Sequence, residues 1–329
     1  MLKDRILKLK QDTTVLTCNP ILDEFDMDEC DILDELCPSN SYINSKVNDC
    51  LNYLKNLSVH FEDSYISAFS SYIEAMTYLE LIKKFDVVRI TETTVPTPDF
   101  KIIDKENKLE IFAEVKSLSY FDGILNYHEV QETALQNQII STEKIQAGEK
   151  IVSTLTEYTP FKKRNSTKRN TSSLYIIESI IDKINNLYKH EQFANPDTIL
   201  IVDLKLFSGY FLSIENVSAF FYENTPDQIA SGTLWNIAFG KNGNLILKPI
   251  KVEGEKNIDG ILSKNGILVE YNNIKGLIFI LYGHSKERIC VGFTRYKEQD
   301  NKPFQFISEI CKYFNDDFNT MAWEYLHIK

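Results

Sequence analysis

The sequence predicts an α/β fold in which helices flank a mixed central sheet, and three observations indicate it. An amphipathic stripe over residues 62–85 is typical of a helix, and a near-continuous apolar run over residues 195–207 is typical of a buried strand. Between and after these segments, helical and extended patterns alternate as helix, strand, hairpin, helix, strand. This order is that of an α/β domain.

The first half of this pattern begins with the helix at residues 62–85. Its apolar residues recur at intervals of three and four, and they are Tyr65, Phe69, Tyr72, Met76 and Leu79. The segment "DVVRITET", residues 86–93, then predicts a short strand. Two strand-like runs follow in "VPTPDFKIIDKENKLEIFAEVKSL", residues 95–118, and the polar residues 105–108 predict a turn that joins them into a hairpin.

The second half continues with a polar stretch, His128 to Tyr158, that predicts a helix. A further amphipathic helix is expected after Ser172 or Ser173, either of which can cap its first turn. The strand at residues 195–207 comes next, and residues 274–285 and 288–296 predict a second hairpin. A closing helix is expected over residues 303–318.

The composition and the net charge indicate which compartment and which kinds of site to expect. The chain has 329 residues, 43% of them hydrophobic, and a formal net charge of -11. No signal-like segment and no apolar run of about 18 residues is present, so we expect a cytoplasmic protein without a membrane span. The cysteines form no CxxC pair and follow no zinc-type spacing.

Charge is unevenly distributed along the chain. Residues 23–35 are densely acidic, and residues 162–169 hold five cations, Lys162, Lys163, Arg164, Lys168 and Arg169. Such runs are ordinarily solvated surface. In a functional interpretation the basic segment contacts a phosphate backbone, and the acidic segment binds a partner protein or masks the nucleic-acid groove.

The hairpin places charged residues where apolar ones are expected. A turn at residues 105–108 puts apolar side chains opposite one another along one face, which sets the register. Asp99 then lies opposite Glu114, with Cβ atoms roughly 4.5–5.5 Å apart, and Lys116 shares their face. Two carboxylates this close are tolerated if they share a proton or if a cation lies between them, and with Lys116 beside them they suit a divalent cation such as Mg²⁺ or Mn²⁺. The alternative is an exposed face on which Lys101 and Lys116 neutralise the two acids.

"TPDF", "EVK" and the helix before them resemble the PD-(D/E)XK nuclease superfamily, the fold of many restriction endonucleases. In restriction-enzyme-like members a glutamate of the first helix precedes the first strand by a little over three turns. Glu74 lies thirteen positions before Val87 and matches this spacing, with Glu80 as the competing candidate. Polar neighbours predict an open polar surface around Glu74; they are Ser70, Ser71, Thr77 and Tyr78.

The resemblance implies a restriction-endonuclease-like core at residues 61–206, best matched over 62–118. It leaves a helical insertion at about 120–170, an acidic N-terminal extension at 1–60 and a C-terminal region at 207–329 that completes or covers the sheet. The helix after Ser172 and the strand after it would be the second core helix and the fourth strand.

The resemblance also assigns roles. Asp99 and Glu114 would bind Mg²⁺ or Mn²⁺ with the main-chain carbonyl of Val115, and Glu74 would complete the metal shell. Lys116 would act on the attacking water and on the charge of the transition state. In the second core helix, Lys183 rather than Glu178 is the expected nucleic-acid contact, the alternative being an exposed lysine without a role.

The sequence therefore predicts a metal-dependent nuclease that cleaves phosphodiester bonds, with DNA as the expected substrate. Because acidic residues outnumber basic ones, we expect the protein to hold nucleic acid weakly by itself. A partner such as a helicase or sensor subunit would deliver the nucleic acid, or a homodimer would bring two sites together. By analogy, nuclease subunits of bacterial antiphage or restriction systems fit this description. The alternative is a non-catalytic module of the same fold that binds nucleic acid or a protein partner.

Overall fold

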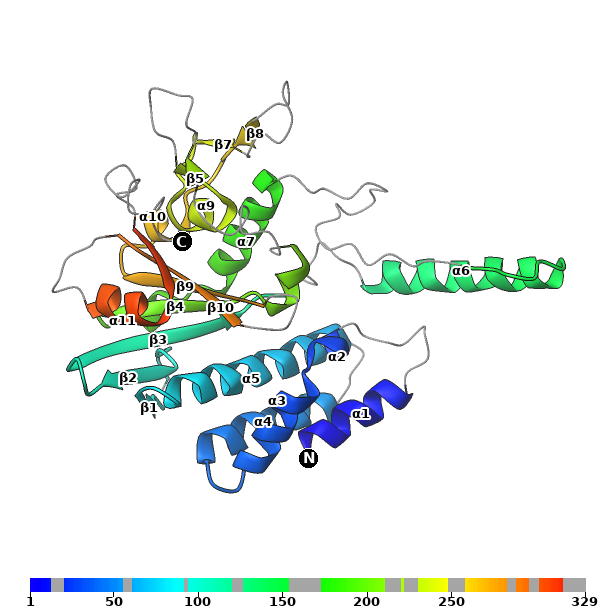
Figure 1. The fold of residues 1–329 in the computed structure, drawn as a ribbon, viewed down its shortest axis with the longest axis horizontal. Coiled ribbons are helices and arrows are strands. Elements are labelled where there is room, and N and C mark those ends of the chain that lie inside the picture. The colour runs from blue at the N-terminus through cyan, green and yellow to red at the C-terminus, as the bar shows by residue number, and fades with distance from the viewer. Residues whose placement is uncertain are drawn as a thin grey trace. The chain divides into compact units, whose positions relative to one another are not determined.

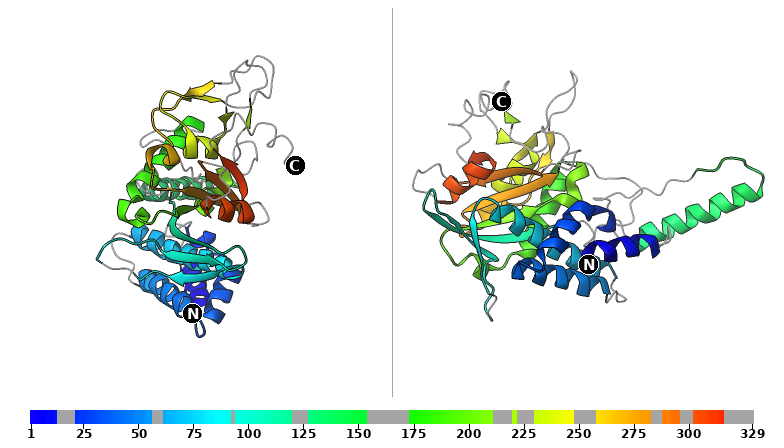
Figure 2. Two further views of the ribbon diagram at one scale, coloured as in Figure 1. Left: turned by 90° about the vertical axis from the view of Figure 1, so that its left-hand side faces the viewer. Right: turned by 60° about the horizontal axis from the view of Figure 1, so that its bottom comes forward.

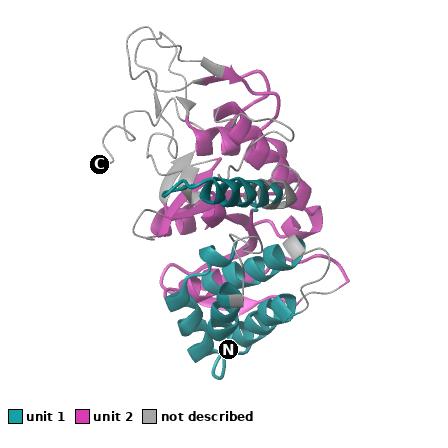
Figure 3. Ribbon diagram, turned by 90° about the vertical axis from the view of Figure 1, so that its right-hand side faces the viewer, with its two compact units in different colours: residues 1–76, 119–170 teal, residues 77–118, 171–329 magenta. Residues whose placement is uncertain are grey.

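The computed structural model describes most of the chain, namely residues 1–12, 21–55, 61–91, 94–119, 127–153, 173–210, 220–221, 230–247, 258–282, 288–295 and 302–315. The chain forms two compact units, coloured separately in Figure 3. The first comprises residues 1–76 and 119–170, and the second comprises residues 77–118 and 171–329. No helix of the described residues is both long and apolar enough to cross a membrane.

The described part of the first unit is helical. Its elements are α1 (Leu2–Asp12), α2 (Ile21–Glu24), α3 (Met27–Leu36), α4 (Ser41–Lys55), the larger part of α5 (Phe61–Ile82) and α6 (Tyr127–Gln146). Aromatic rings fill its core: the ring centroid of Phe25 lies 5.3 Å from that of Phe69 and 5.0 Å from that of Tyr72. The predicted stripe of α5 is confirmed, since Tyr65, Phe69 and Tyr72 are each about 1% exposed.

The acidic segment, residues 23–35, serves the packing of this unit. Asp26 caps α3 by accepting hydrogen bonds from the main-chain nitrogens of Asp28 and Glu29. The carboxylate of Asp34 accepts from the main-chain nitrogens of Leu2 (2.8 Å) and Lys3 (3.0 Å), at the start of α1. Part of the negative charge therefore stabilises helix N-termini, where it interacts favourably with the helix dipole.

The helix predicted over residues 128–158 ends earlier, at Gln146. Gly148 adopts φ 91°, its main-chain nitrogen donates to the carbonyl of Ile145, and that of Glu149 donates to the carbonyl of Lys144. These two hydrogen bonds form a Schellman motif, which ends a helix at a glycine in the left-handed region.

A mixed sheet organises the second unit (Figure 1). Over the described residues it has seven strands in the order β1 (Asp86–Arg89), β2 (Phe100–Asp104), β3 (Leu109–Ser117), β4 (Thr198–Asp203), β9 (Gly276–Tyr282), β10 (Arg288–Thr294) and β11 (Lys312–Asn315). The pairs β1–β2, β2–β3 and β9–β10 are antiparallel, and β3–β4, β4–β9 and β10–β11 are parallel. The predicted α/β class, mixed sheet and second hairpin are confirmed.

Helices and short strands accompany this sheet and are seen from further directions in Figure 2. They are α7 (Ser173–Leu187), η1 (His190–Phe193), η2 (Lys205–Tyr210), α9 (Thr233–Phe239), α10 (Ile267–Glu270), α11 (Lys302–Ile310), β5 (Phe220–Phe221), β6 (Ala230–Ser231), β7 (Leu245–Leu247) and β8 (Ile258–Ile261). The predicted strand at residues 195–207 is β4, which is buried along its whole length between two parallel neighbours. Its apolar run fits this position.

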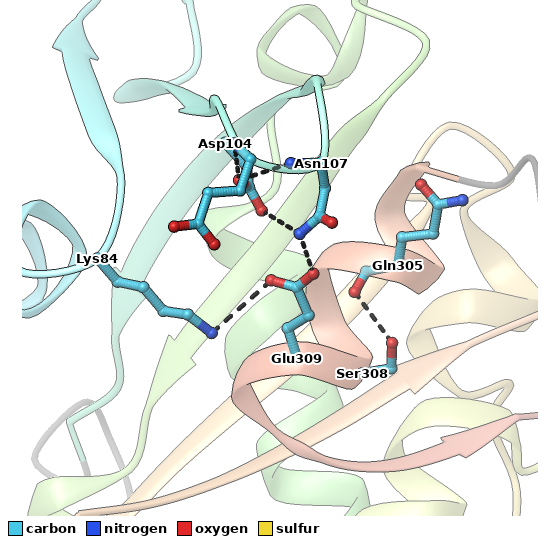
Figure 4. A network of polar contacts seen from close by, with 7 residues as sticks. Lys84, Asp104, Asn107, Gln305, Ser308 and Glu309 are labelled. Atoms are coloured by element: carbon cyan, nitrogen blue, oxygen red, sulfur yellow. Dashed lines mark hydrogen bonds and ion pairs between the residues drawn. The ribbon is translucent and has the colours of Figure 1, made fainter.

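The register of the first hairpin is as predicted. Phe100 pairs with Ala113, Ile102 with Ile111, and Asp104 with Leu109. Asp104 holds the turn, as Figure 4 shows, by accepting from the main-chain nitrogen of Asn107 at 3.1 Å and from its side-chain amide at 2.9 Å. These hydrogen bonds, with that of the Asn107 side chain first, lower the pKa of Asp104.

Different helices cover the two faces of the sheet. A Cβ atom added at Gly276 or Gly292 would overlap Ile307 of α11, so these glycines make room for α11 on one face. Phe293, which points the opposite way from Gly292, packs edge-on against Phe239 of α9 at 5.8 Å. Helix α9 therefore covers the other face.

The prediction of a closing helix over residues 303–318 is wrong for residues 312–315, and residues 316–318 lie outside the described part of the chain. Helix α11 ends at Ile310, and Lys312–Asn315 form β11 in parallel register with β10. Pairing with an open sheet edge satisfies the main-chain groups of this segment, and this interaction is invisible to a local apolar pattern.

Candidate active site

Asp99 lies just before β2 and reaches the neighbouring strand. One of its carboxylate oxygens accepts a hydrogen bond from the main-chain nitrogen of Val115 at 2.8 Å. Its own main-chain carbonyl accepts from the nitrogen of Ile90 at 3.1 Å. Because Phe100 pairs with Ala113, alternation places Asp99 opposite Glu114 on one face of the hairpin. The opposition of the two carboxylates stays a prediction, which extends the observed register by one residue beyond β2.

Glu114 is a buried carboxylate, with only 1% of its surface exposed. Its Oε1 accepts a hydrogen bond from the side-chain amide of Gln192 at 2.6 Å and also contacts the ammonium of Lys116. Charge-assisted hydrogen bonds of this kind compensate for the desolvation of a buried carboxylate. Glu114 is thus held in a fixed position by two donors.

These side chains share the face of the sheet that α9 covers. Ala113 pairs with Ile199, which pairs with Gly276 on the α11 face. Side chains alternate along a strand, so Glu114 and Lys116 point to the opposite face.

The alternative interpretation, an exposed hairpin face on which lysines neutralise Asp99 and Glu114, does not describe this site. Lys101 forms an ion pair with Glu110 at 2.7 Å, and Glu114 is buried. Lys116 does contact Glu114, as that alternative required, but it does so in a site where the carboxylate is withdrawn from water.

The donor set fits a hard cation. Among the described residues, no group of three or more histidine, cysteine, aspartate or glutamate side chains is gathered closely enough to hold a metal. Mg²⁺ does not need such a cage, since it commonly uses one or two carboxylates, retains several waters and takes the rest of its ligands from the substrate. Asp99 and Glu114, with the main-chain carbonyl of Val115, supply such a set of oxygens.

Glu74 belongs to the first unit, where its carboxylate pairs with the ammonium of Lys46 on α4. The surface around it is not open and polar as predicted, because Ser71 and Thr77 are only 7% and 2% exposed. Buried apolar residues occupy more than one side of α5 and enclose these small hydroxyl side chains. Glu80, the competing candidate, contacts Lys83 at 2.8 Å and Arg288 at 3.9 Å.

Lys183 lies on α7 and is 5% exposed, so it is not the exposed lysine of the alternative interpretation. Burial lowers the pKa of its ammonium to about 7. Glu178 of the same helix accepts hydrogen bonds from the main-chain nitrogen (2.9 Å) and hydroxyl (2.6 Å) of Ser263. The two candidate residues of α7 therefore differ: Glu178 binds the loop after β8, and Lys183 is a buried titratable amine.

The predicted basic contacts lie outside the described residues; they are Lys162, Lys163, Arg164, Lys168 and Arg169. Gln192 is the site residue that sequence reasoning missed. It is 8% exposed, lies in the short η1 turn and is separated from Glu114 by 78 positions, so no local pattern marks it. No protein-family model, curated protein or solved structure matches the chain.

Proposed function

We propose that the chain is a Mg²⁺- or Mn²⁺-dependent nuclease that hydrolyses phosphodiester bonds in DNA, built on a restriction-endonuclease-like core of the PD-(D/E)XK superfamily. The observation that carries the proposal is the hydrogen bond that holds Asp99 against the main chain of Val115, next to Glu114, with Lys116 in contact with Glu114. Like charges at such positions destabilise a sheet unless a cation or proton lies between them. The presence of Asp99 and Glu114 at these positions therefore favours a metal-binding role.

The order of elements supports the same core. Helix α5 is followed by three antiparallel strands, β1, β2 and β3. After α6, which falls in the predicted insertion, come α7, the short η1 turn and β4, which is parallel to β3. This order agrees with the predicted first helix, three strands, second helix and fourth strand of the PD-(D/E)XK resemblance.

Each side chain then has a chemical task. Asp99 and Glu114, with the Val115 carbonyl, would hold the metal ion, which when bound supplies Lewis-acid stabilisation of a phosphate and a more acidic water. Gln192 and Lys116 orient the Glu114 carboxylate. The Lys116 ammonium would orient the attacking water and stabilise the negative charge that develops on the oxygens around phosphorus in the transition state.

Delivery of the nucleic acid is assigned to the basic segment at residues 162–169 and to a partner. A net charge of -11 weakens non-specific binding to a phosphate backbone. A helicase or sensor subunit, or a second copy of the chain, would raise the local concentration of DNA at the site. By analogy, an antiphage or restriction system is the setting that fits.

Lys116→Ala tests the proposal, with Lys101→Ala as the matched control because Lys101 pairs with Glu110 on the same hairpin. A residue that acts on transition-state charge contributes little to ground-state binding. At saturating Mg²⁺, cleavage by Lys116→Ala should fall by about two orders of magnitude or more, while the variant still binds DNA and still binds Mg²⁺, more weakly because Glu114 has lost one donor. The Lys101 variant should cleave at the parental rate.

The assay measures Mg²⁺-dependent cleavage of single- and double-stranded DNA, alone and with candidate partner subunits. Parental cleavage by Lys116→Ala would refute the assigned role of the lysine. If the parent binds nucleic acid or a protein partner but cleaves under none of these conditions, the chain is a non-catalytic binding module.

A further inference from the structure

Two cysteines of the second unit, Cys290 on β10 and Cys311 after the end of α11, lie against each other. Both are free thiols, and both are partly exposed. The parallel register pairs Val291 with Lys312, so each cysteine immediately precedes a residue of that pair. The thiol of Cys311 donates a hydrogen bond to the sulfur of Cys290, which places the two sulfur atoms in direct contact.

A neighbouring glycine shows which face of the sheet holds this pair. A Cβ atom added at Gly292 would lie 3.0 Å from the Cβ of Cys311 and 3.5 Å from its Sγ. Cys290 lies two residues before Gly292 and points to the same face of β10, which α11 covers. Adjacent strands lie about 4.7–4.9 Å apart, within the Cα separation of about 4.4–6.8 Å that a disulfide spans. The two sulfur atoms can therefore bond without a large movement of the main chain.

Arg288 supplies positive charge beside the pair. It lies two residues before Cys290 on β10 and shares its face. Its Nε donates to the hydroxyl of Tyr282 at 3.0 Å, and a second guanidinium nitrogen lies 3.9 Å from the carboxylate of Glu80. A cation held next to a partly exposed thiol is the environment of a reactive cysteine.

The two thiols differ in acidity. The hydrogen bond from Cys311 and the charge of Arg288 lower the pKa of the Cys290 thiol. Burial and the carboxylates of Asp203 and Glu80 oppose this shift without reversing it. The pKa of Cys311 is raised well above its usual value, first by its hydrogen bond to Cys290 and then by desolvation. Because the thiolate is the nucleophile, Cys290 is the sulfur that reacts first.

We propose that Cys290 and Cys311 form a reversible disulfide, in which a hydroperoxide oxidises Cys290 and Cys311 then completes the bond. The Cys290 thiolate attacks one oxygen of hydrogen peroxide, the O–O bond breaks, and hydroxide leaves as a sulfenic acid forms. The sulfur of Cys311 attacks the sulfenic sulfur, and its proton leaves with the hydroxyl group as water. The two sulfur atoms together lose two electrons to the peroxide, and a dithiol reverses the step by exchange.

The disulfide would fasten an outer strand of the sheet. Over the described residues β11 is the last strand, and its loss would expose the main-chain groups of β10. In a reducing compartment a pair of this kind bonds transiently, in response to an oxidant. Asp99, Glu114 and Lys116 take no part, so the proposal does not rest on nuclease activity.

The test uses the full, unmodified chain, reduced with dithiothreitol and then separated from it. An equimolar amount of hydrogen peroxide is added, the remaining thiols are alkylated in denaturant, and the unreduced peptides are analysed by mass spectrometry. Two of the six cysteine thiols should be lost, the linked peptides should contain Cys290 and Cys311, and dithiothreitol should restore all six. A disulfide between other cysteines, a disulfide between two chains, or the absence of any disulfide would overturn the proposal.

Three variants assign the two roles. Cys311→Ser should leave Cys290 as a sulfenic acid that dimedone captures, and Cys290→Ser should give no dimedone adduct at Cys311. Cys37→Ser, a control at another partly exposed thiol, should form the disulfide as the parent does. A sulfenic acid captured at Cys311, or loss of the disulfide in the Cys37 variant, would contradict the assignment.

The reduced parent provides a further reading with limiting iodoacetamide at neutral pH. Cys290 should be alkylated about tenfold or more faster than Cys311, since each unit of difference in pKa changes the thiolate fraction about tenfold. Faster alkylation of Cys311 would refute the role of Cys290 as the thiolate.

Discussion

The side-chain amide of Gln192 lies 2.6 Å from Oε1 of Glu114, so a residue of the η1 turn holds a carboxylate of β3. Both side chains are buried, and loss of the donor would leave the buried Glu114 carboxylate with one partner fewer. The pairing makes Gln192 a positioning residue of the candidate site.

Gln192→Ala should lower the free energy of unfolding by about 1–3 kcal/mol, the penalty for removing one partner of a buried polar group. It should also weaken Mg²⁺ binding, because Glu114 loses its fixed orientation. Chemical denaturation and metal titration measure the two effects. Gln138→Ala, on the exposed surface of α6, serves as the control and should change stability by less than about 0.5 kcal/mol. Unchanged Mg²⁺ affinity in the Gln192 variant would limit this residue to a structural role.

Asp99→Asn should fold and be slightly more stable than the parent without metal. The variant removes a negative charge opposite Glu114, and its amide oxygen can still accept from the nitrogen of Val115. Added Mg²⁺ should raise the melting temperature of the parent and not that of the variant, since a ligand that binds only the native state stabilises it. Asp63→Asn, an equivalent change at an exposed position, should keep the Mg²⁺ response. Equal Mg²⁺-induced shifts in parent and Asp99→Asn would rule out the metal site.

Replacement of the basic segment by serine should weaken DNA binding and flatten its salt dependence. The substituted residues are Lys162, Lys163, Arg164, Lys168 and Arg169. Each lost contact with a phosphate should reduce the slope of log K against log salt by about 0.9, because fewer counterions are released. A variant with five other exposed lysines changed to serine has the same net charge and controls for long-range effects; its sites are Lys55, Lys83, Lys105, Lys150 and Lys189. An identical slope in the two variants would mean that the segment is ordinary solvated surface.

Lys183→Met should stabilise the protein at neutral pH by about 1–3 kcal/mol, because it removes the desolvation of a buried charge. The pKa of Lys183 is about 7 in the folded chain and about 10.4 in the unfolded chain. Between these values the unfolded state binds more protons, so the parent gains stability as pH rises from about 7 to about 10. Below about pH 7 both states are charged, and the contribution is constant.

Denaturation midpoints measured from pH 6 to pH 10 should therefore converge for the parent and Lys183→Met as pH rises. Lys189→Met, at an exposed position, should follow the parent throughout. Parallel stability profiles for the parent and Lys183→Met would show that the amine of Lys183 does not titrate in this range.

The parts of the fold that could be predicted are those set by local side-chain patterns. The hairpin register follows from apolar residues on one face and from a four-residue turn, so the opposition of Asp99 and Glu114 could be derived from the residue pattern alone. The near-continuous apolar run of β4 indicated a strand that is buried on both faces in the middle of the sheet. Gly148, by contrast, ends α6 through a hydrogen-bond motif that the polar pattern around it does not mark.

What could not be predicted depends on contacts distant in sequence. Gln192 supports Glu114 only because β3 and β4 are adjacent and parallel, with η1 just before β4. The strand β11 forms because it pairs with the open edge of β10. The local apolar pattern carries no sign of that pairing and therefore predicted a helix. The burial of Lys183 depends on packing around α7, which an amphipathic pattern cannot specify for a residue at the margin of the stripe.

The turn held by Asp104 and Asn107 has a consequence for how the candidate site assembles during folding. The β2–β3 hairpin closes over a turn of a few residues, so the loop-closure entropy of bringing Asp99 beside Val115 is small. The contact between Glu114 and Gln192 spans 78 positions and must await the crossover through α7 and the docking of β4. We therefore expect Glu114 to lie in a hydrated hairpin beside Asp99 early in folding, and to lose its contact with water late, when Gln192 docks.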